Sequence, residues 1–185
     1  MRKWPSPSRS IAMHLRCGGL IAYPTEYCYG LGCDPRNRRA VQRLLQLKRR
    51  PQHKGLILIA GKFKQIAPYL QALTPNEQEI LRRDGAQVVT YLMPAQPHAP
   101  RWLRGAHDAL AVRLTAHPQA AALCNAFNMA LVSTSANRSG QRPARTAKQC
   151  QRLFGNRVWV LPGKVGKRKK SSTIRTWLNG KIIRT

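Results

Sequence analysis

Hydrophobic residues follow two alternating kinds of spacing along the chain, and this alternation predicts an α/β domain. Short, almost wholly apolar runs are typical of buried strands, whereas apolar residues that recur every three or four positions indicate helices. Strands are expected at 20–23, 55–60, 88–93, 109–114, 130–134 and 158–161. Helices are expected at 8–16, 37–49, 74–83, 117–127 and 146–154.

Segments that show neither spacing are expected to be turns and loops. Residues 24–35 (PTEYCYGLGCDP) contain several turn formers, so we expect an irregular loop there. Asn179 and Gly180 join two alternating runs near the end of the chain, which is a strong hairpin signal. We expect a mobile loop at 163–171, flexible residues at 1–8, and a single domain over 1–185, because this length suits one core.

The charge balance is strongly one-sided, with 33 Lys and Arg against 6 Asp and Glu and a formal net charge of +27. Such a surface attracts anions, of which nucleic acid is the usual large one. At 43% hydrophobic residues, the chain is not composed like a disordered basic tail. No apolar run approaches the ~20 residues of a membrane-spanning helix, and no secretory signal is evident, so we expect a cytoplasmic protein without membrane contact.

Residue spacing excludes several common kinds of site. The five cysteines form neither a disulfide framework nor a zinc pattern, so we expect free thiols packed mostly as small apolar groups. The five histidines have no metal-ligand spacing and are expected in turns or on the surface. The sequence also lacks a phosphate loop, a GxGxxG motif after a strand and a nucleophile elbow.

Glu26 and Asp34 are two of only six acidic residues, and both follow the first expected strand. Ligands of open α/β sheets bind beyond the carboxyl ends of the strands, so these carboxylates could serve Mg²⁺ or an amine substrate. The structural alternative, which we favour from the sequence alone, is that Asp34 caps the following helix and Glu26 pairs with an arginine.

Cations at three places are candidates for anion binding. Lys48, Arg50 and Lys54 lie between a helix end and a strand start, where they suit phosphate, although a solvated helix end is the simpler interpretation. Arg113 lies inside an apolar strand, and a buried guanidinium needs an anion from the protein or from a ligand. The lysines of 163–171 are most simply a solvated charge run.

Hydroxyl and amide side chains gather at 133–140 (STSANRSG), where an expected strand runs into a turn. They could form hydrogen bonds with an adenine, a ribose or a phosphate. Ordinary capping of the turn by its own side chains is the alternative.

Five segments, in this order, resemble the YrdC family of single-domain threonylcarbamoyl-AMP synthases. They are IAYPTEYCYGLGCD (21–34), LKRRPQHKGLILIA (47–60), ALAVRLTAHP (109–118), LVSTSANRSG (131–140) and SSTIRTW (171–177). Each segment alone is a modest match, but together they extend over nearly the whole chain. The resemblance implies a YrdC-like twisted mixed sheet flanked by helices around a concave basic cavity.

The resemblance also implies a reaction in which L-threonine, bicarbonate and ATP give L-threonylcarbamoyl-AMP and pyrophosphate, with Mg²⁺ accompanying ATP. The product would serve the t6A37 modification of tRNAs that read ANN codons. Other proteins of that pathway would transfer the threonylcarbamoyl group, so these proteins and tRNA are expected partners.

Site residues are carried over from the motif matches. Lys48 and Arg50 match the Lys-x-Arg pair of the family and would be the catalytic residues that hold the phosphates. Further contacts are implied with ATP for Thr90, Ser135, Asn137 and Ser172, and with threonine for Thr25, Lys54, Arg113 and Ser133. Arg113 would take the threonine carboxylate, and no metal ligand from the protein is implied.

One segment departs from the family, and one alternative function stays open. Residues 83–88 stand where the family commonly has a Trp-Pro-Gly-Pro stretch, so the shape of this loop is expected to differ. The alternative is a non-catalytic module of the same fold that binds tRNA or double-stranded RNA, which the strong charge would suit. The KRR, AVR and STSAN segments favour catalysis, because binding by charge alone would not need them.

Overall fold

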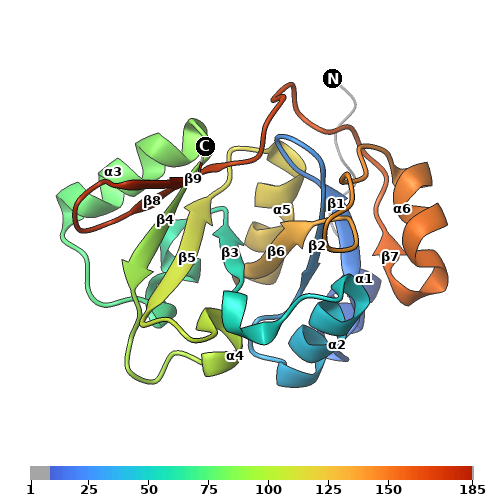
Figure 1. The fold of residues 1–185 in the computed structure, drawn as a ribbon, viewed down its shortest axis with the longest axis horizontal. Helices are drawn as coiled ribbons and strands as arrows, with labels where there is room; N and C mark the ends of the chain where they lie inside the picture. The colour runs from blue at the N-terminus through green and yellow to red at the C-terminus, as the bar shows by residue number, and fades with distance from the viewer. Residues whose placement is uncertain (1–8, 185) are drawn as a thin grey trace.

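A computed structural model describes residues 9–184, and its nine strands form one mixed sheet in the order β7-β1-β2-β6-β3-β5-β4-β8-β9 (Figure 1). Three neighbouring pairs are parallel (β1 with β7, β3 with β5, β4 with β8), and the other five are antiparallel. The strands are β1 (Ile21–Pro24), β2 (Tyr29–Cys33), β3 (Ile57–Ala60), β4 (Val89–Pro94), β5 (Ala109–Leu114), β6 (Leu131–Ser135), β7 (Trp159–Val160), β8 (Thr173–Thr176) and β9 (Ile182–Arg184).

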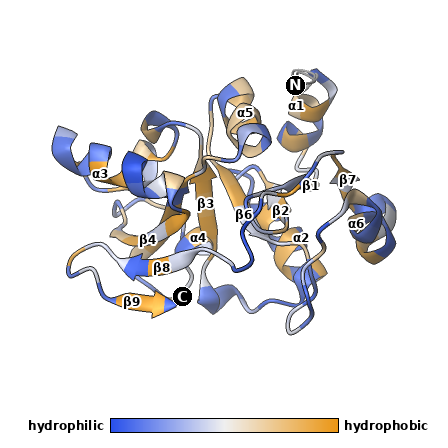
Figure 2. Ribbon diagram, turned by 90° about the horizontal axis from the view of Figure 1, so that it is seen from above, coloured by the Kyte–Doolittle hydropathy of each residue, from blue (hydrophilic) through white to orange (hydrophobic). Residues whose placement is uncertain are grey.

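Helices cover both faces of this sheet, in agreement with the flanking helices that the family resemblance implies. They are α1 (Arg9–Arg16), α2 (Arg38–Lys48), α3 (Pro75–Ala86), α4 (Arg101–Arg104), α5 (Pro118–Phe127) and α6 (Ala147–Phe154). Successive strand residues face opposite sides, so Leu58 and Val132 join the core shared with α2, α3, α4 and α6, while Ile59 and Leu131 join the core shared with α1 and α5. Figure 2 shows the central strands β3 and β6 as hydrophobic and much of α6 as hydrophilic.

The expected irregular loop at 24–35 is wrong over part of its length, because residues 29–33 form the central strand β2. All five residues of β2 are buried, so no alternation of polar and apolar positions marks the strand. Its two glycines have a packing role: a Cβ at Gly32 would lie 2.5 Å from the carbonyl oxygen of Val132 on β6. The glycines, which the sequence pattern suggests are turn formers, instead allow β2 and β6 to lie close together.

The helix expected at 74–83 begins as predicted but continues to Ala86. Thr74 and Glu77 form a capping box at its start. At its end, Gly85 allows close packing, because a Cβ there would lie 2.3 Å from the carbonyl oxygen of Leu114. Asp84 accepts a hydrogen bond of 2.6 Å from the hydroxyl of Tyr91. Asp84 and Gly85, just beyond the expected helix end, therefore fasten the last turn of α3 to the sheet.

Residues 163–171, called the strap below, connect β7 to β8 and contain neither helix nor strand, as expected. Backbone hydrogen bonds join the strap to the loop after β1: Gly166 N to Thr25 O at 2.9 Å and Arg168 N to Glu26 O at 3.2 Å. Its four lysines are exposed, which confirms a solvated charge run. The mobility of the strap stays a prediction.

The remaining sequence expectations concern the chain ends and the membrane. The terminal hairpin is confirmed: β8 and β9 pair antiparallel, and Gly180 has a positive φ of 66°. The expected flexibility of residues 1–8 lies outside the described residues. Within 9–184, the structure contains no helix whose length and hydropathy would let it cross a bilayer.

Candidate functional site

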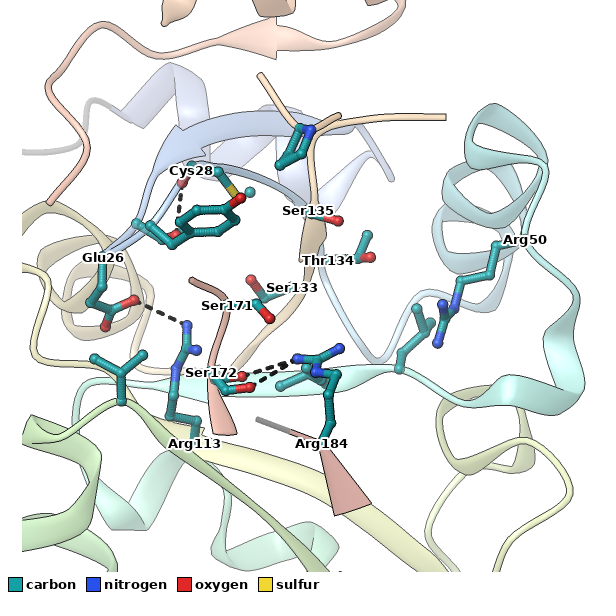
Figure 3. A pocket seen from close by; sticks show the side chains of 17 residues that line it. Glu26, Cys28, Arg50, Arg113, Ser133, Thr134, Ser135, Ser171, Ser172 and Arg184 are labelled. Atoms are coloured by element: carbon teal, nitrogen blue, oxygen red, sulfur yellow. Dashed lines mark hydrogen bonds and ion pairs between the residues drawn. The ribbon is translucent and has the colours of Figure 1, made fainter. Parts of the chain in front are cut away.

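A cavity of about 310 Å³ lies between the central strands, the loop after β1 and the strap (Figure 3). Six of the expected site residues line it: Thr25, Arg50, Arg113, Ser133, Ser135 and Ser172. Ser133 and Ser135 share one face of β6, because alternate residues of a strand point the same way. Gly30 pairs with Ser135 across β2 and β6 and also lines the cavity, where it leaves space that a side chain would fill.

The side chains that line the cavity include three arginines, Arg50, Arg113 and Arg184, but only one acid, Glu26. The role of Arg184 was missed from the sequence. It lies on β9, and its Nη2 donates to the carbonyl oxygen of Ser172 at 3.1 Å. The terminal run predicts a hairpin, but it does not predict the strand register, which shifts between Ile174 and Arg175 and pairs Arg184 with Ile174.

Lys48 ends α2 with its side chain buried, so the interpretation of this residue as part of a solvated helix end is wrong. Its ammonium donates to the carbonyl oxygens of Ser135, at 2.5 Å, and of Asn137, at 2.8 Å. Burial lowers the pKa of Lys48 to about 8, and the charge of nearby Arg50 adds to this effect. Lys48 therefore ties α2 to the turn that follows β6.

Arg50 and Lys54 take different positions despite their closeness in sequence. Arg50 lines the cavity, and its Nη2 donates to the carbonyl oxygen of Gly55 at 3.0 Å. Lys54 lies in a short 3-10 turn (Gln52–Lys54) with its side chain exposed, and it is not among the residues that line the cavity. Of the Lys-x-Arg pair, Arg50 lines the cavity, whereas Lys48 does not line it and reaches it only through its contact with Ser135.

Thr90 and Asn137 lie behind the cavity wall and support residues that line it. The hydroxyl of Thr90 donates to Ser172 Oγ at 2.9 Å. Ser135 Oγ donates to Asn137 Oδ1 at 2.6 Å, and Asn137 Nδ2 donates to the carbonyl oxygens of Arg138 and Gln141. The turn after β6 therefore caps itself with its own side chains, which was the alternative for this segment.

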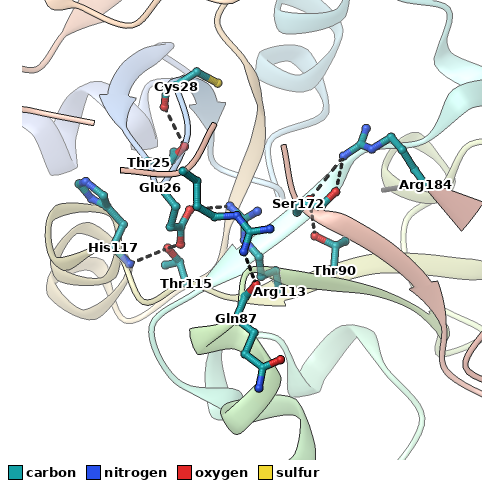
Figure 4. A network of polar contacts seen from close by, with 11 residues as sticks. Thr25, Glu26, Cys28, Gln87, Thr90, Arg113, Thr115, His117, Ser172 and Arg184 are labelled. Carbon is teal, nitrogen blue, oxygen red and sulfur yellow. Dashed lines mark hydrogen bonds and ion pairs between the residues drawn. The ribbon is translucent and has the colours of Figure 1, made fainter. Parts of the chain in front are cut away.

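Glu26 and Arg113 form a buried ion pair, with Glu26 Oε2 at 3.1 Å from Arg113 Nη2 (Figure 4). The hydroxyl of Thr115 donates to Glu26 Oε1 at 2.6 Å. Burial alone would raise the pKa of Glu26, but the charge of Arg113 and the Thr115 hydrogen bond outweigh it and hold the pKa below its ordinary value. The pairing of Glu26 with an arginine, favoured from the sequence, is confirmed.

Asp34 was expected to cap α2, and this expectation is wrong. Asn37 is the capping residue, since its Oδ1 accepts from the backbone N–H of Ala40 at 3.0 Å. Asp34 instead pairs with Arg36 at 2.7 Å, outside the cavity. Asn was not singled out as the cap, although it is as good an N-cap residue as Asp.

The expectations for cysteine are confirmed and those for histidine are confirmed in part. Cys28, Cys33, Cys124 and Cys150 are free and buried, and Cys17 is free and exposed. His117 is buried, contrary to the expected turn or surface position, and its Nε2 lies 3.1 Å from the carbonyl oxygen of Lys164 in the strap. In the described part of the chain, no three His, Cys, Asp or Glu residues gather in a way that could hold a metal ion.

Three comparisons with known proteins are informative. A family model, Sua5/YciO/YrdC, described as "Telomere recombination", matches residues 13–185. The threonylcarbamoyl-AMP synthase of Methylobacillus flagellatus is 51% identical over 177 residues, covering 96% of this chain and 98% of that protein. The threonylcarbamoyl-AMP synthase of Thiobacillus denitrificans is 50% identical over 171 residues, covering 92% of this chain and 91% of that protein.

A solved structure extends this similarity to three dimensions. P. abyssi Sua5 complexed with L-threonine matches with a TM-score of 0.81 and 28% sequence identity. The match covers 92% of this chain and 51% of the Sua5 chain, so this chain spans about half the length of that relative.

Proposed function

This chain belongs to the Sua5/YciO/YrdC family, and we propose that its cavity forms L-threonylcarbamoyl-AMP from L-threonine, bicarbonate and ATP. Its relatives of about 50% identity over nearly the whole chain are threonylcarbamoyl-AMP synthases, and the chain is an enzyme of this type. The observation that supports the assignment of residues is a cavity lined by three arginines and only one acid. Figure 3 shows Arg113 with Glu26 at one side, Arg50 at the other, and Arg184 between them.

The chemistry needs no nucleophile from the protein. The amine of threonine and bicarbonate combine to a carbamate with loss of water. A carbamate oxygen then attacks the α-phosphorus of ATP, and the bond to the β-phosphate oxygen breaks to release pyrophosphate. The protein has to orient the two substrates and offset the charge of the triphosphate. A cavity of arginines and hydroxyls, without a catalytic triad, suits this task.

We assign the triphosphate to Lys48, Arg50 and Arg184, whose positive charges complement its negative charge. The nucleotide would also contact the hydroxyls of Ser135 and Ser172, with Thr90 and Asn137 supporting them from behind. Threonine would bind with its carboxylate on Arg113 and with Thr25 and Ser133 nearby. Lys48 does not line the cavity, but it is retained because its buried ammonium contacts Ser135, which does. Lys54 is left out, because its side chain is exposed.

The cavity does not fit a metal ion held by the protein itself. Glu26 is the only carboxylate that lines it, and both of its oxygens are engaged by Arg113 and Thr115. We therefore propose that Mg²⁺ enters with ATP as part of the substrate.

The wider role of the product is part of the proposal. We propose that threonylcarbamoyl-AMP made here serves the t6A37 modification of tRNAs that read ANN codons, in the cytoplasm, with partner proteins performing the transfer. A non-catalytic RNA-binding module of the same fold is not favoured, because the similarity to synthases extends over nearly the whole chain.

The test of the proposed function is an assay of pyrophosphate release by the purified protein. Release should require threonine, bicarbonate and ATP together, and mass spectrometry should detect threonylcarbamoyl-AMP. Release that does not depend on threonine, or tight, salt-dependent tRNA binding without any adenylate, would contradict the assignment.

ATP binding should weaken as the pH rises through the pKa of Lys48, which is about 8. The folded protein loses the Lys48 charge above this pH, so the dissociation constant for ATP should rise by up to about tenfold per further pH unit. Calorimetry between about pH 7 and about pH 9.5 measures the dissociation constant for ATP. Threonine is left out of the experiment, because its amine titrates in the same pH range. Lys48→Met should show weak binding without this pH dependence, and a flat profile for the unaltered protein would refute the prediction.

A further inference from the structure

We propose that Glu26 is a positioning residue for threonine. Its carboxylate holds Nη2 of Arg113, so that the other N–H donors of the guanidinium face the carboxylate of the substrate. This inference rests on the proposed function, in which Arg113 binds threonine. Glu26 would act through Arg113, so the inference concerns substrate recognition and not the attack on ATP.

The hydrogen bonds of Arg113 leave donors for a second anion. A guanidinium carries five N–H donors, and the bond to Glu26 uses Nη2. The buried Nε atom has no hydrogen-bond partner among the residues that the structure describes. Arg113 is 7% exposed and lines the cavity. A buried, unsatisfied donor is costly, and a bound carboxylate at this wall of the cavity would remove that cost.

Glu26 is itself held firmly enough to orient another side chain. Thr115 fixes its second oxygen, and the backbone N–H of His117 in turn donates to the Thr115 hydroxyl at 3.2 Å. Its backbone oxygen accepts from Arg168 in the strap. Arg113 and Thr115 lie two positions apart at the end of β5, so they approach the carboxylate from the same side of the chain (Figure 4).

Two physical effects of Glu26 on threonine binding have opposite signs. Its negative charge repels the carboxylate of threonine, so charge alone predicts that neutralising Glu26 strengthens binding. Its hold on Arg113 pre-organises the donors, so orientation predicts that neutralising Glu26 weakens binding. We infer that orientation dominates, because Arg113 is buried and has no other anion of the described chain to hold it in place.

The decisive variant is Glu26→Gln, which keeps the shape of the side chain and removes its charge. We expect the KM and the calorimetric dissociation constant for threonine to rise by roughly tenfold, while the KM for ATP changes by less than about twofold. Thr115→Val keeps the charge but releases the carboxylate, and it should raise the threonine KM in the same direction by about threefold. Glu79→Gln, in an exposed pair with Arg82, is the matched control and should change neither constant.

The outcomes separate this inference from the proposed function. If the unaltered protein fails to bind threonine, the proposed function fails and takes the inference with it. If the unaltered protein binds threonine and Glu26→Gln binds it equally well or more tightly, only the inference fails. Equal losses for threonine and ATP would show a general structural role and would also overturn it. If Glu26→Gln does not fold, Thr115→Val decides by the same criteria.

Discussion

Replacement of Lys48 by alanine should lower threonine-dependent pyrophosphate release by about a hundredfold to a thousandfold. This is the range observed when an enzyme loses one hydrogen-bond donor that stabilises the charge of the transition state. Lys48 is the last residue of α2, and its buried ammonium contacts the turn after β6. No other lysine within 9–184 is buried.

The measurement is single-turnover pyrophosphate release at saturating threonine, with thermal unfolding as a check on the fold. Lys148→Ala, which removes an exposed lysine of α6, is the control and should retain full activity. Lys48→Met, which keeps most of the side-chain volume, should lose as much activity as Lys48→Ala, because charge and not packing is decisive. Activity within about threefold of the unaltered protein in both Lys48 variants would remove this residue from the catalytic assignment.

Replacement of Arg113 by alanine should abolish threonine binding and also destabilise the fold. The change leaves Glu26 buried without its cation, which costs about 3–5 kcal/mol in comparable ion pairs. Without Arg113 the pKa of Glu26 should rise above its unfolded value, so the loss of stability should be large at neutral pH and diminish as the pH falls and Glu26 becomes protonated. Urea unfolding at about pH 7 and about pH 4.5 measures this difference.

A double variant separates the two consequences of losing Arg113. Glu26→Gln combined with Arg113→Ala removes the unpaired charge, so most of the lost stability should return while threonine binding remains absent. Restored threonine binding in the double variant would show that Arg113 does not hold the substrate. A double variant no more stable than Arg113→Ala would show that packing, and not charge, caused the destabilisation.

The fold could be predicted where local signals agree with burial. Thr74 and Glu77 mark the start of α3, the apolar run 109–114 coincides with β5, and Asn179-Gly180 marks the terminal hairpin. Prediction failed where turn-forming residues serve packing. In β2, glycines allow neighbouring strands to approach, and in α3, Gly85 packs against Leu114. Neighbours distant in sequence decide such positions, so a local pattern cannot reveal them.

The sequence by itself determined which residues of this protein were candidates: the Lys-x-Arg pair, the arginine inside an apolar strand, and the scarce carboxylates. Only the tertiary structure decided how they are paired. It joined Glu26 to Arg113 across 87 positions of chain, brought Arg184 from the edge strand into the cavity, and left Lys54 outside. The physical reason is that residue type decides what a side chain can bind, whereas strand register and the course of the strap decide which partners come within hydrogen-bond distance.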